Sequence, residues 1–407
     1  MEKYESILKK ATASLRKAQL ETKELYAKHT FDLLAMDGTG RAFKGSEADA
    51  LRKQIEKETG LHFDLVNHGE GISAKNKFVR VIKKKKSSKS KEMGGELADH
   101  IANSSKSTVS VVVPDDEKAE LNFLFLSGEQ TLPLEIVIDA GRNSKLRLFE
   151  WYGSASEGKG TVSSLHAIKA GKNSDVEVNV LHNENSKTSV GIARSVLLSE
   201  RSRLALNTIY KGGFLTKSTT NAEAGGKCSE LFVNDIVFGE GDQKFDVLNL
   251  MLNSGESTRI VMRSGAALRE KAYCALKGYA KVAKSAKESY SKVEENGLLV
   301  DSGARIELLP DMSVDCKDVA FAAHGSASAP LDEEVLFYLK SRGLDEARAK
   351  KAMVASFLAK YLSGIGSNIV KTIAMTILLD KLDGKVNSQA PRIGNGGQWI
   401  FSEKVKE

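Results

Sequence analysis

A nearly identical turn sequence occurs twice in this chain, thirty positions apart. Residues 140–144 read Ala-Gly-Arg-Asn-Ser, residues 170–174 read Ala-Gly-Lys-Asn-Ser, and a related unit follows at 198–204. Glycine and asparagine tolerate the left-handed backbone conformation, so these segments suit tight corners. Between the corners lie short runs in which apolar and polar residues alternate, the period of a strand with one buried face. The clearest runs are 109–113, 134–138, 176–180 and 202–206.

Many short strands at repeating intervals, with no long helix between them, restrict the fold to a solenoid, a sandwich or a barrel. The repetition favours a β-helix, in which each rung buries its inward side chains against the rungs above and below. A β-sandwich is the alternative that the strand pattern leaves open. A solenoid has open ends that caps must cover, and this chain has helical sequence at both ends. We therefore predict a mainly β protein, with a right-handed parallel β-helix core and N-terminal and C-terminal helical segments.

The pattern divides the chain into four regions. Residues 1–75 are predicted to be mostly helical, because apolar residues recur there at three- and four-residue spacing, with a short strand at 31–35. Residues 76–325 form the β-helix core, and residues 326–384 form a C-terminal helical domain. Residues 385–407 are predicted to be an irregular tail, since proline and glycine oppose regular structure there.

Helix boundaries are marked by residues that suit capping positions. Glycine ends a helix because it adopts the left-handed conformation readily, and aspartate or serine begins one because its side chain accepts hydrogen bonds from free backbone N–H groups. The chain offers Gly60 after a helix at 47–59, Gly343 after a helix within 331–343, Asp345 before the next helix, and Ser367 before a third that runs to about residue 382. Three acids, Asp332 to Glu334, lie where the positive end of the dipole of the 331–343 helix favours carboxylates.

Charge and cysteine content exclude several classes of protein. The formal net charge is +7, but the basic run at 82–93 lacks the interleaved aromatic or arginine residues that stack on bases, so we expect no nucleic-acid partner. Three widely spaced cysteines favour a reduced, intracellular protein. The charged N-terminus has no signal-peptide core, and the apolar segment 373–379 is too short to span a bilayer. We expect a cytoplasmic protein without membrane insertion.

Enzyme signatures are missing from the sequence. There is no GxxxxGK[ST] phosphate loop, no GxSxG elbow and no HExxH zinc motif, and the repeat region has no dense acidic cluster. Cys228 and Cys274 are expected to be buried small hydrophobic residues, and His166 and His182 to be ordinary surface residues in repeat loops. We assign no catalytic residue and predict that the chain is not an enzyme.

His324 is the best single candidate for chemistry. Its neighbours from 322 to 327 are alanine, glycine and serine, which leave room for a metal, a cluster or a partner backbone. Neutral imidazole is a common ligand for iron and zinc. Cys316, eight positions earlier, is a second candidate ligand, although the spacing is not that of a compact zinc finger. The residues alone also allow a histidine that is hydrogen-bonded at a domain joint.

Several blocks in the second half of the chain resemble the SufB/SufD family, the scaffold subunits of the SUF iron–sulfur cluster assembly system. They are Gly-Tyr-Ala-Lys-Val at 278–282, Asn-Gly-Leu-Leu-Val at 296–300, Leu-Pro-Asp-Met-Ser at 309–313, Asp-Val at 318–319, His-Gly at 324–325 and the helix at 331–343. The first half is similar only in its general sequence pattern, without matching motifs, and the Trp-Lys motif frequent near the family's N-terminus is absent. The resemblance implies a right-handed parallel β-helix flanked by helices.

The resemblance also distinguishes two branches of the family. SufB-type scaffolds carry two functional cysteines, and the aligned positions here hold Asp235 and Ala304. The interfacial histidine of SufD-type subunits matches His324, whereas the cysteine that often stands two residues before it is Ala322 here. The resemblance is therefore to a SufD-like subunit.

A SufD-like subunit implies a non-enzymatic scaffold. It would bind a SufC-like ABC ATPase through its C-terminal helices and pair with a SufB-like scaffold or a second copy of itself. His324 would present a nitrogen to iron or to a transient iron–sulfur cluster, and the isolated chain would hold no cofactor tightly. The expected ATPase contacts are Leu336, Phe337, Leu339 and Arg342, with internal packing as the alternative role for the apolar ones. The alternative function is a cytoplasmic β-helix enzyme acting on a sugar or small substrate, with His324 as acid or base.

Overall fold

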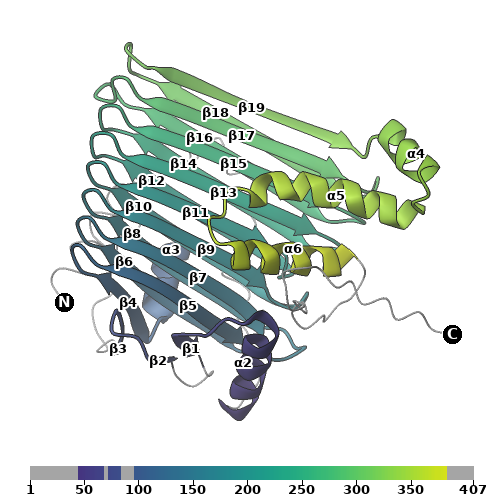
Figure 1. Cartoon of the computed structure of the whole chain (residues 1–407), viewed down its shortest axis with the longest axis horizontal. Coiled ribbons are helices and arrows are strands. Elements are labelled where there is room, and N and C mark those ends of the chain that lie inside the picture. Colours follow the sequence, from purple (N-terminus) through teal and green to yellow (C-terminus); the bar gives the residue numbers. More distant parts are fainter. Residues whose placement is uncertain (1–44, 68–71, 84–95, 383–407) are drawn as a thin grey trace.

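The computed structural model describes residues 45–67, 72–83 and 96–382, and within them the chain is a parallel β-solenoid with helices on its outer surfaces (Figure 1). Several expectations lie outside the described residues: the helix near the start of the chain, the strand at 31–35, most of the basic run at 82–93 and the tail at 385–407.

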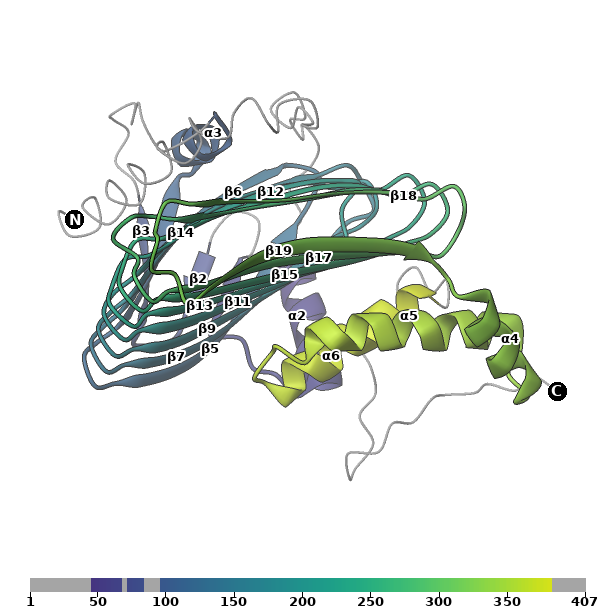
Figure 2. The same ribbon diagram turned by 90° about the horizontal axis from the view of Figure 1, so that it is seen from above.

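Two sheets face each other and alternate along the chain (Figures 1 and 2). From β4 onward each strand pairs in parallel with the strand two places later, because each rung contributes one strand to each sheet. The ten-stranded sheet, sheet 1, runs β19-β17-β15-β13-β11-β9-β7-β5-β1-β2, and the nine-stranded sheet, sheet 2, runs β18-β16-β14-β12-β10-β8-β6-β4-β3. This topology confirms the parallel solenoid and excludes the sandwich, whose sheets are antiparallel.

The strands and helices have the following bounds. Sheet 1 contains β1 (Leu65–Asn67), β2 (Ile72–Ala74), β5 (Lys118–Ser127), β7 (Lys145–Ser154), β9 (Asp175–Asn183), β11 (Arg203–Tyr210), β13 (Glu230–Gly239), β15 (Arg259–Leu268), β17 (Tyr290–Leu299) and β19 (Phe321–Pro330). Sheet 2 contains β3 (Val79–Lys83), β4 (Ser107–Val113), β6 (Thr131–Ala140), β8 (Thr161–Ala170), β10 (Ser189–Leu198), β12 (Leu215–Ala224), β14 (Lys244–Asn253), β16 (Tyr273–Val282) and β18 (Arg305–Val314). The helices are α2 (Gly45–Thr59), α3 (Glu96–Ser104), α4 (Glu333–Ser341), α5 (Glu346–Leu362) and α6 (Asn368–Leu382).

One corner of successive rungs is held in the left-handed backbone conformation. The predicted corners Asn143 and Asn173 have φ of 55° and 57°. Asn143 donates its backbone N–H to the carbonyl of Lys172 at 2.9 Å, and Asn173 donates to Glu200 at 3.0 Å, so each bond reaches the next rung. The same bond links all corner residues of this kind, which follow one another every 27 to 31 residues: Asp116, Asn143, Asn173, Arg201, Cys228, Ser257 and Glu288.

The corner ladder corrects one cysteine prediction. Cys228 is exposed and has φ of 57°, because it occupies a corner whose backbone is fixed by the neighbouring rungs. Its assignment as a buried hydrophobic residue is therefore wrong. Cys274 is buried inside β16 as predicted, and burial raises the pKa of its thiol.

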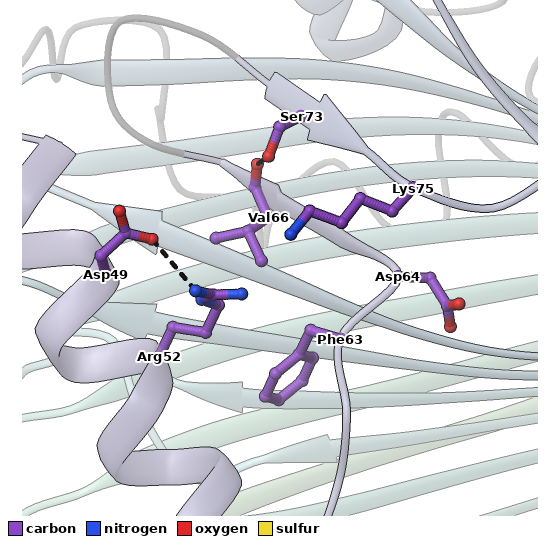
Figure 3. Close-up of a pocket in the computed structure, with 7 residues that line it drawn as sticks. All are labelled: Asp49, Arg52, Phe63, Asp64, Val66, Ser73 and Lys75. Atoms are coloured by element: carbon purple, nitrogen blue, oxygen red, sulfur yellow. Dashed lines mark hydrogen bonds and ion pairs between the residues drawn. The ribbon is translucent and has the colours of Figure 1, made fainter.

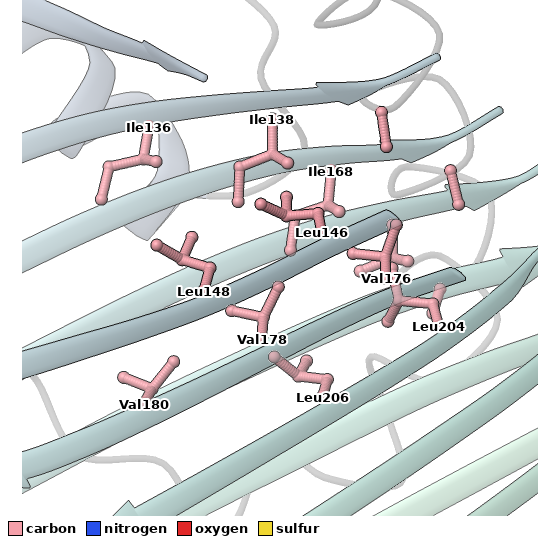
Figure 4. Packing of buried hydrophobic residues seen from close by; sticks show 14 of the residues in the cluster. Ile136, Ile138, Leu146, Leu148, Ile168, Val176, Val178, Val180, Leu204 and Leu206 are labelled. Atoms are coloured by element: carbon pink, nitrogen blue, oxygen red, sulfur yellow. The ribbon is translucent and has the colours of Figure 1, made fainter. Parts of the chain in front are cut away.

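Inward side chains fill the space between the two sheets, here called the lumen. Leu148, Val178 and Leu206 stand in register in consecutive rungs of sheet 1, and they pack in one fully buried cluster with Ile136 and Ile138 of sheet 2 (Figure 4). Burying one such side chain contributes about 1.5–3 kcal/mol. Each rung therefore depends on its neighbours for the burial of its core.

The lumen also holds the two histidines assigned to the surface from the sequence, and that assignment is wrong. His166 lies in β8 and His182 in β9, each 1% exposed. Both fall on the inward side of a strand, and buried imidazoles need partners. His166 Nε2 lies 2.9 Å from Oε2 of Glu150, and His182 Nδ1 lies 2.8 Å from Oε1 of Glu184. Burial works to raise the pKa of Glu150, but His166, the Tyr152 hydroxyl and Arg194 together lower that pKa overall.

The predicted helix caps are confirmed. Helix α2 is followed by Gly60, with φ of 70°, and Gly343, with φ of 95°, follows α4. The carboxylate of Asp332 accepts hydrogen bonds from two backbone N–H groups at the start of α4, and that of Asp345 accepts one at the start of α5. None of the described helices is long and apolar enough to cross a membrane.

Helices α2, α5 and α6 pack on the outer face of sheet 1, and α3 packs on sheet 2 (Figure 2). The turn between α5 and α6 packs against a row of hydrogen-bonded asparagine side chains on sheet 1. Asn207 donates to Asn179 and Asn234 donates to Asn207, both at 2.8 Å. Gly364 lies so close that a Cβ there would fall 2.0 Å from the Asn234 amide. The end of α6 is fixed by Lys381 Nζ, which donates to the carbonyls of Lys211 and Phe238 and to Oε1 of Gln243.

We predict that Asn173→Val destabilises the protein by about 1–3 kcal/mol, while Asn173→Gly leaves its stability nearly unchanged. A β-branched residue is strained in the left-handed conformation and glycine is not. Urea unfolding of both variants measures the effect. An equal loss in the two variants would instead assign the effect to the hydrogen bond that the Asn173 side chain donates to Asn143.

Candidate functional site

The solenoid is open at the end formed by β18 and β19. These strands are the last of their sheets, so no strand within the described part of the chain pairs with their outer edges (Figure 1). Most residues of β19 are exposed, including Phe321 at its start. A long unprotected edge is a template for pairing with another chain. This end, here called the open rung, is the candidate site because it carries His324.

His324 is the fourth residue of β19, inside the edge strand rather than at its junction with α4. It stands in register with Val293, whose side chain faces the lumen, and it is exposed because no rung covers it. Its Nδ1 lies 3.2 Å from the carbonyl oxygen of Pro310 in β18. A carbonyl can only accept, so Nδ1 carries the proton and Nε2 keeps a free lone pair. The imidazole is thereby set in the tautomer in which Nε2 can bind a metal.

Cys316 is not brought together with His324. It is 7% exposed and packs with Val282 and Ala286 in a small apolar cluster. It lies beyond the end of β18, six residues after Pro310, and a strand rises about 3.3 Å per residue. Among the described residues, no three His, Cys, Asp or Glu side chains are grouped so that they could hold a metal ion.

Glu295 is a residue of this region that sequence reasoning missed. It lies in β17, one rung below β19, on the same lumen-facing side as Val293, and it is 0% exposed. No side chain of the described residues hydrogen-bonds its carboxyl oxygens, and burial raises its pKa to about 8, although a backbone hydrogen bond from Leu309 works to lower it. Ser264 and Asp235 precede it in register in the two rungs below, and burial also raises the pKa of Asp235. Two buried acids therefore share one column of lumen positions that leads up to the open rung.

Helix α4 exposes much of its apolar surface. Its large exposed apolar residues are Val335 at 43%, Phe337 at 75% and Tyr338 at 55%. The guanidinium of Arg342 lies 5.2 Å from the ring centroid of Tyr338. Leu336 is buried and Leu339 is half-buried, so these two expected contacts serve internal packing at least in part. Val335 and Tyr338 were missed because the helical stripe read from the sequence did not predict which face the solenoid covers.

Comparison with known proteins assigns this architecture to a family. Residues 123–357, more than half of the chain, match the profile described as SUF system FeS cluster assembly, SufBD core domain. The chain belongs to the SufBD family. The region matched includes the solenoid rungs from β5 upward, the open rung and α4.

The SufBD chain is also similar to curated SufD proteins. It is 19% identical over 247 residues to the iron–sulfur cluster assembly protein SufD of Escherichia coli (strain K12), and 22% identical over 260 residues to SufD of Bacillus subtilis (strain 168). The alignments cover 61% and 63% of this chain, and 58% and 59% of the relatives. A SufBD family protein of Pyrococcus horikoshii is 30% identical over 147 residues, 36% of this chain and 32% of the relative. The SufD-like resemblance is confirmed.

Asp235 and Ala304, the positions that the sequence resemblance matches to the SufB-type cysteines, lie in different surroundings in this SufBD protein. Asp235 is buried in the lumen, where the amide of Asn249 donates to its Oδ2 at 2.6 Å. Ala304 is buried in the turn between β17 and β18. One position therefore carries a buried carboxyl group and the other a methyl group.

A pocket of about 230 Å³ lies at the other end of the solenoid, between α2 and the strands β1 and β2 (Figure 3). Its acidic residues are engaged locally. Asp49 forms an ion pair of 3.4 Å with Arg52, and Asp64 accepts a hydrogen bond from Asn76 at 2.8 Å. Phe63, Val66, Ser73 and Lys75 complete its lining. The pocket is separated from His324 by the whole stack of rungs.

We predict that Glu295 makes the protein less stable as pH rises. Its folded pKa of about 8 exceeds the unfolded value of 4.5, so the folded state holds the extra proton between these values and loses stability as pH increases through them. Glu295→Gln should remove up to about 4 kcal/mol of this loss between pH 5 and 9.

Urea unfolding at pH 5, 7 and 9 tests the prediction. Glu294→Gln is the matched control, because Lys360 lowers the pKa of Glu294 to about 2 and the group does not titrate in this range. A wild-type protein whose stability falls no more steeply than that of Glu295→Gln would contradict the prediction.

Proposed function

We propose that this chain is a non-enzymatic, SufD-like scaffold subunit of a SUF iron–sulfur cluster assembly complex. The observation that carries the proposal is the open rung, where the outer edges of β18 and β19 pair with no strand of the described chain and where Nε2 of His324 has no hydrogen bond to a described residue. Membership of the SufBD family favours this role over a stand-alone enzyme acting on a sugar, and the pocket between α2 and β1 lies far from the histidine.

The open rung is proposed to pair with a second solenoid. Strands β18 and β19 have ten residues each and offer unpaired backbone N–H and C=O groups on both sheets. A terminal rung of another chain could extend both sheets together. It would also cover Ile306, Leu308 and Met312, which are only partly buried. The partner is a SufB-like scaffold, which would supply the cysteines replaced here by Asp235 and Ala304, or a second copy of this chain.

His324 is proposed to present Nε2 to iron or to a nascent cluster held between the two solenoids. Metal-binding histidines commonly donate their second ring N–H to a carbonyl or carboxylate, as His324 does to Pro310. The iron or cluster is cargo, held transiently, and the other ligands would come from the partner.

The exposed face of α4 is proposed as the docking site for a SufC-like ABC ATPase. Exposed apolar side chains can mark protein interaction surfaces, and Val335, Phe337 and Tyr338 are all exposed on this one short helix. Arg342 adds a cation beside the Tyr338 ring. Aromatic residues and arginine are the types that dominate binding energy at interfaces.

Anaerobic affinity purification of the tagged protein from its native host tests the proposed function. The account expects an ABC ATPase and a second solenoid chain to co-purify, with iron in the complex. Recovery of a single species without iron and without an ATPase would contradict it.

We predict that His324→Ala impairs cluster assembly while leaving the fold and the partners in place. The side chain is exposed and makes one hydrogen bond, so its loss should change the unfolding free energy by less than about 1 kcal/mol. Iron and sulfide per purified complex should fall at least tenfold, as expected when a metal ligand is removed.

His62→Ala is the control for this experiment, because His62 is an exposed histidine at the other end of the solenoid. Cluster yield in His324→Ala equal to that of the control would remove His324 from the site.

We predict that Phe337→Asp weakens ATPase binding at least tenfold without unfolding the chain. The ring is 75% exposed in the free protein, so replacing it removes little buried apolar surface and should leave the fold intact. In the complex, the carboxylate of the aspartate would be buried in an apolar interface without a hydrogen-bond partner, which weakens binding. Calorimetric titration with the purified ATPase measures the change. Ile369→Asp is the control, since Ile369 is an exposed apolar residue on α6; equal weakening by both substitutions would contradict docking on α4.

A further inference from the structure

Glu295 is the least satisfied polar side chain near the open rung. It is fully buried, and no side chain of the described residues hydrogen-bonds its carboxyl group, although the backbone of Leu309 in β18 approaches it. An uncompensated carboxyl group in an apolar interior costs several kcal/mol whether it is ionised or neutral. The packing of the solenoid does not require a carboxylic acid at this position. The register partner in the rung below is Ser264, and the lumen-facing residue two positions earlier in β17 is Val293.

Glu295 and His324 border the same part of the lumen. Glu295 stands in register with Ser326, so His324 is its diagonal neighbour in the next rung. Diagonal neighbours on one face of a sheet lie about 7–8 Å apart, within the reach of long side chains. Across the lumen, a Cβ on Gly278 would fall 2.9 Å from Oε1 of Glu295, and Gly278 is in register with Pro310, the residue that holds the His324 ring.

The two side chains offer complementary metal ligands. His324 has its Nδ1 proton committed to Pro310, which leaves the Nε2 lone pair free. Glu295 has two carboxyl oxygens that no side chain of the described residues hydrogen-bonds. A nitrogen and oxygen donor set suits divalent first-row transition metals, which bind imidazole and carboxylate together. A cation here would also compensate the buried carboxylate.

We propose that Glu295 and His324 form a divalent transition-metal site at the mouth of the lumen, with His324 contributing Nε2 and Glu295 a carboxylate oxygen. Binding replaces the carboxyl proton, which leaves to solvent, by the metal ion; no electron is transferred. The remaining coordination positions are left to water or to a partner chain. The site rests on the proposed function only for the use of His324, and it adds a ligand from inside the solenoid.

The test is anaerobic titration of the full chain with Co²⁺, followed by visible absorption and calorimetry. We expect one Co²⁺ per chain, with binding weakened at least tenfold in both Glu295→Gln and His324→Ala. Glu294→Gln, the adjacent acid on the opposite face of β17, should bind within threefold of the wild type. Glu295→Asp, which keeps the charge but shortens the side chain, should fall between wild type and Glu295→Gln.

Circular dichroism of each variant separates loss of the site from loss of the fold. Wild-type affinity in a folded Glu295→Gln, or no Co²⁺ binding by the wild type, would overturn the proposal. Purification of the same variants separates it from the scaffold role. Partners that co-purify with a chain that binds no Co²⁺ would refute the metal site alone, whereas Co²⁺ binding that depends on Glu295 in a chain without partners would refute the scaffold alone.

Discussion

The structure depends on the parallel pairing of each rung with the next. Backbone hydrogen bonds, the corner ladder and the burial of lumen side chains all require a neighbouring rung, so an end rung is only half satisfied. At the first end, β2 pairs antiparallel with β1 and β3 pairs antiparallel with β4, so an antiparallel strand ends each sheet. At the last end, no equivalent strand follows β19 in the described residues. The strand edges that lack a pairing partner at this end are therefore those of β18 and of β19, the strand that carries His324.

The composition of the lumen changes along the stack. The early rungs are filled mainly by aliphatic and aromatic side chains such as Leu148 and Phe123, together with polar pairs such as His166 and Glu150. Near the open rung, the buried carboxyl group of Glu295 is hydrogen-bonded by no side chain of the described residues. Such groups cost stability, and poorly satisfied polar groups of this kind tend to be retained where function needs them. The outer helices are anchored separately, through Gly364 and Lys381, so α4 can present its aromatic face without disturbing the lumen.

The sequence predicted what local chemistry determines and missed what rung-to-rung register determines. Asn143 and Asn173 identified the corners and Asp345 the start of α5, because those residue types favour these conformations in any context. Arg201 adopts the same corner conformation with no such preference, since the ladder imposes it. Glu294 and Glu295 are consecutive in β17, so the sequence alone does not show which of them faces inward. The pairing of β17 with β15 places Glu295 in the lumen. His324 was found through the family resemblance, because small neighbours alone do not distinguish a ligand from an ordinary histidine.

Hydrogen–deuterium exchange of β18 and β19 tests the central claim most directly. It should be measured on the chain alone and in complex with its co-purified solenoid partner. We expect fast exchange of the outward amides of both strands in the free chain and strong protection in the complex, while the inner strands of the same sheets stay protected in both. Protection of β18 and β19 in the free chain, or no change on adding the partner, would contradict the claim that the open rung is the assembly interface.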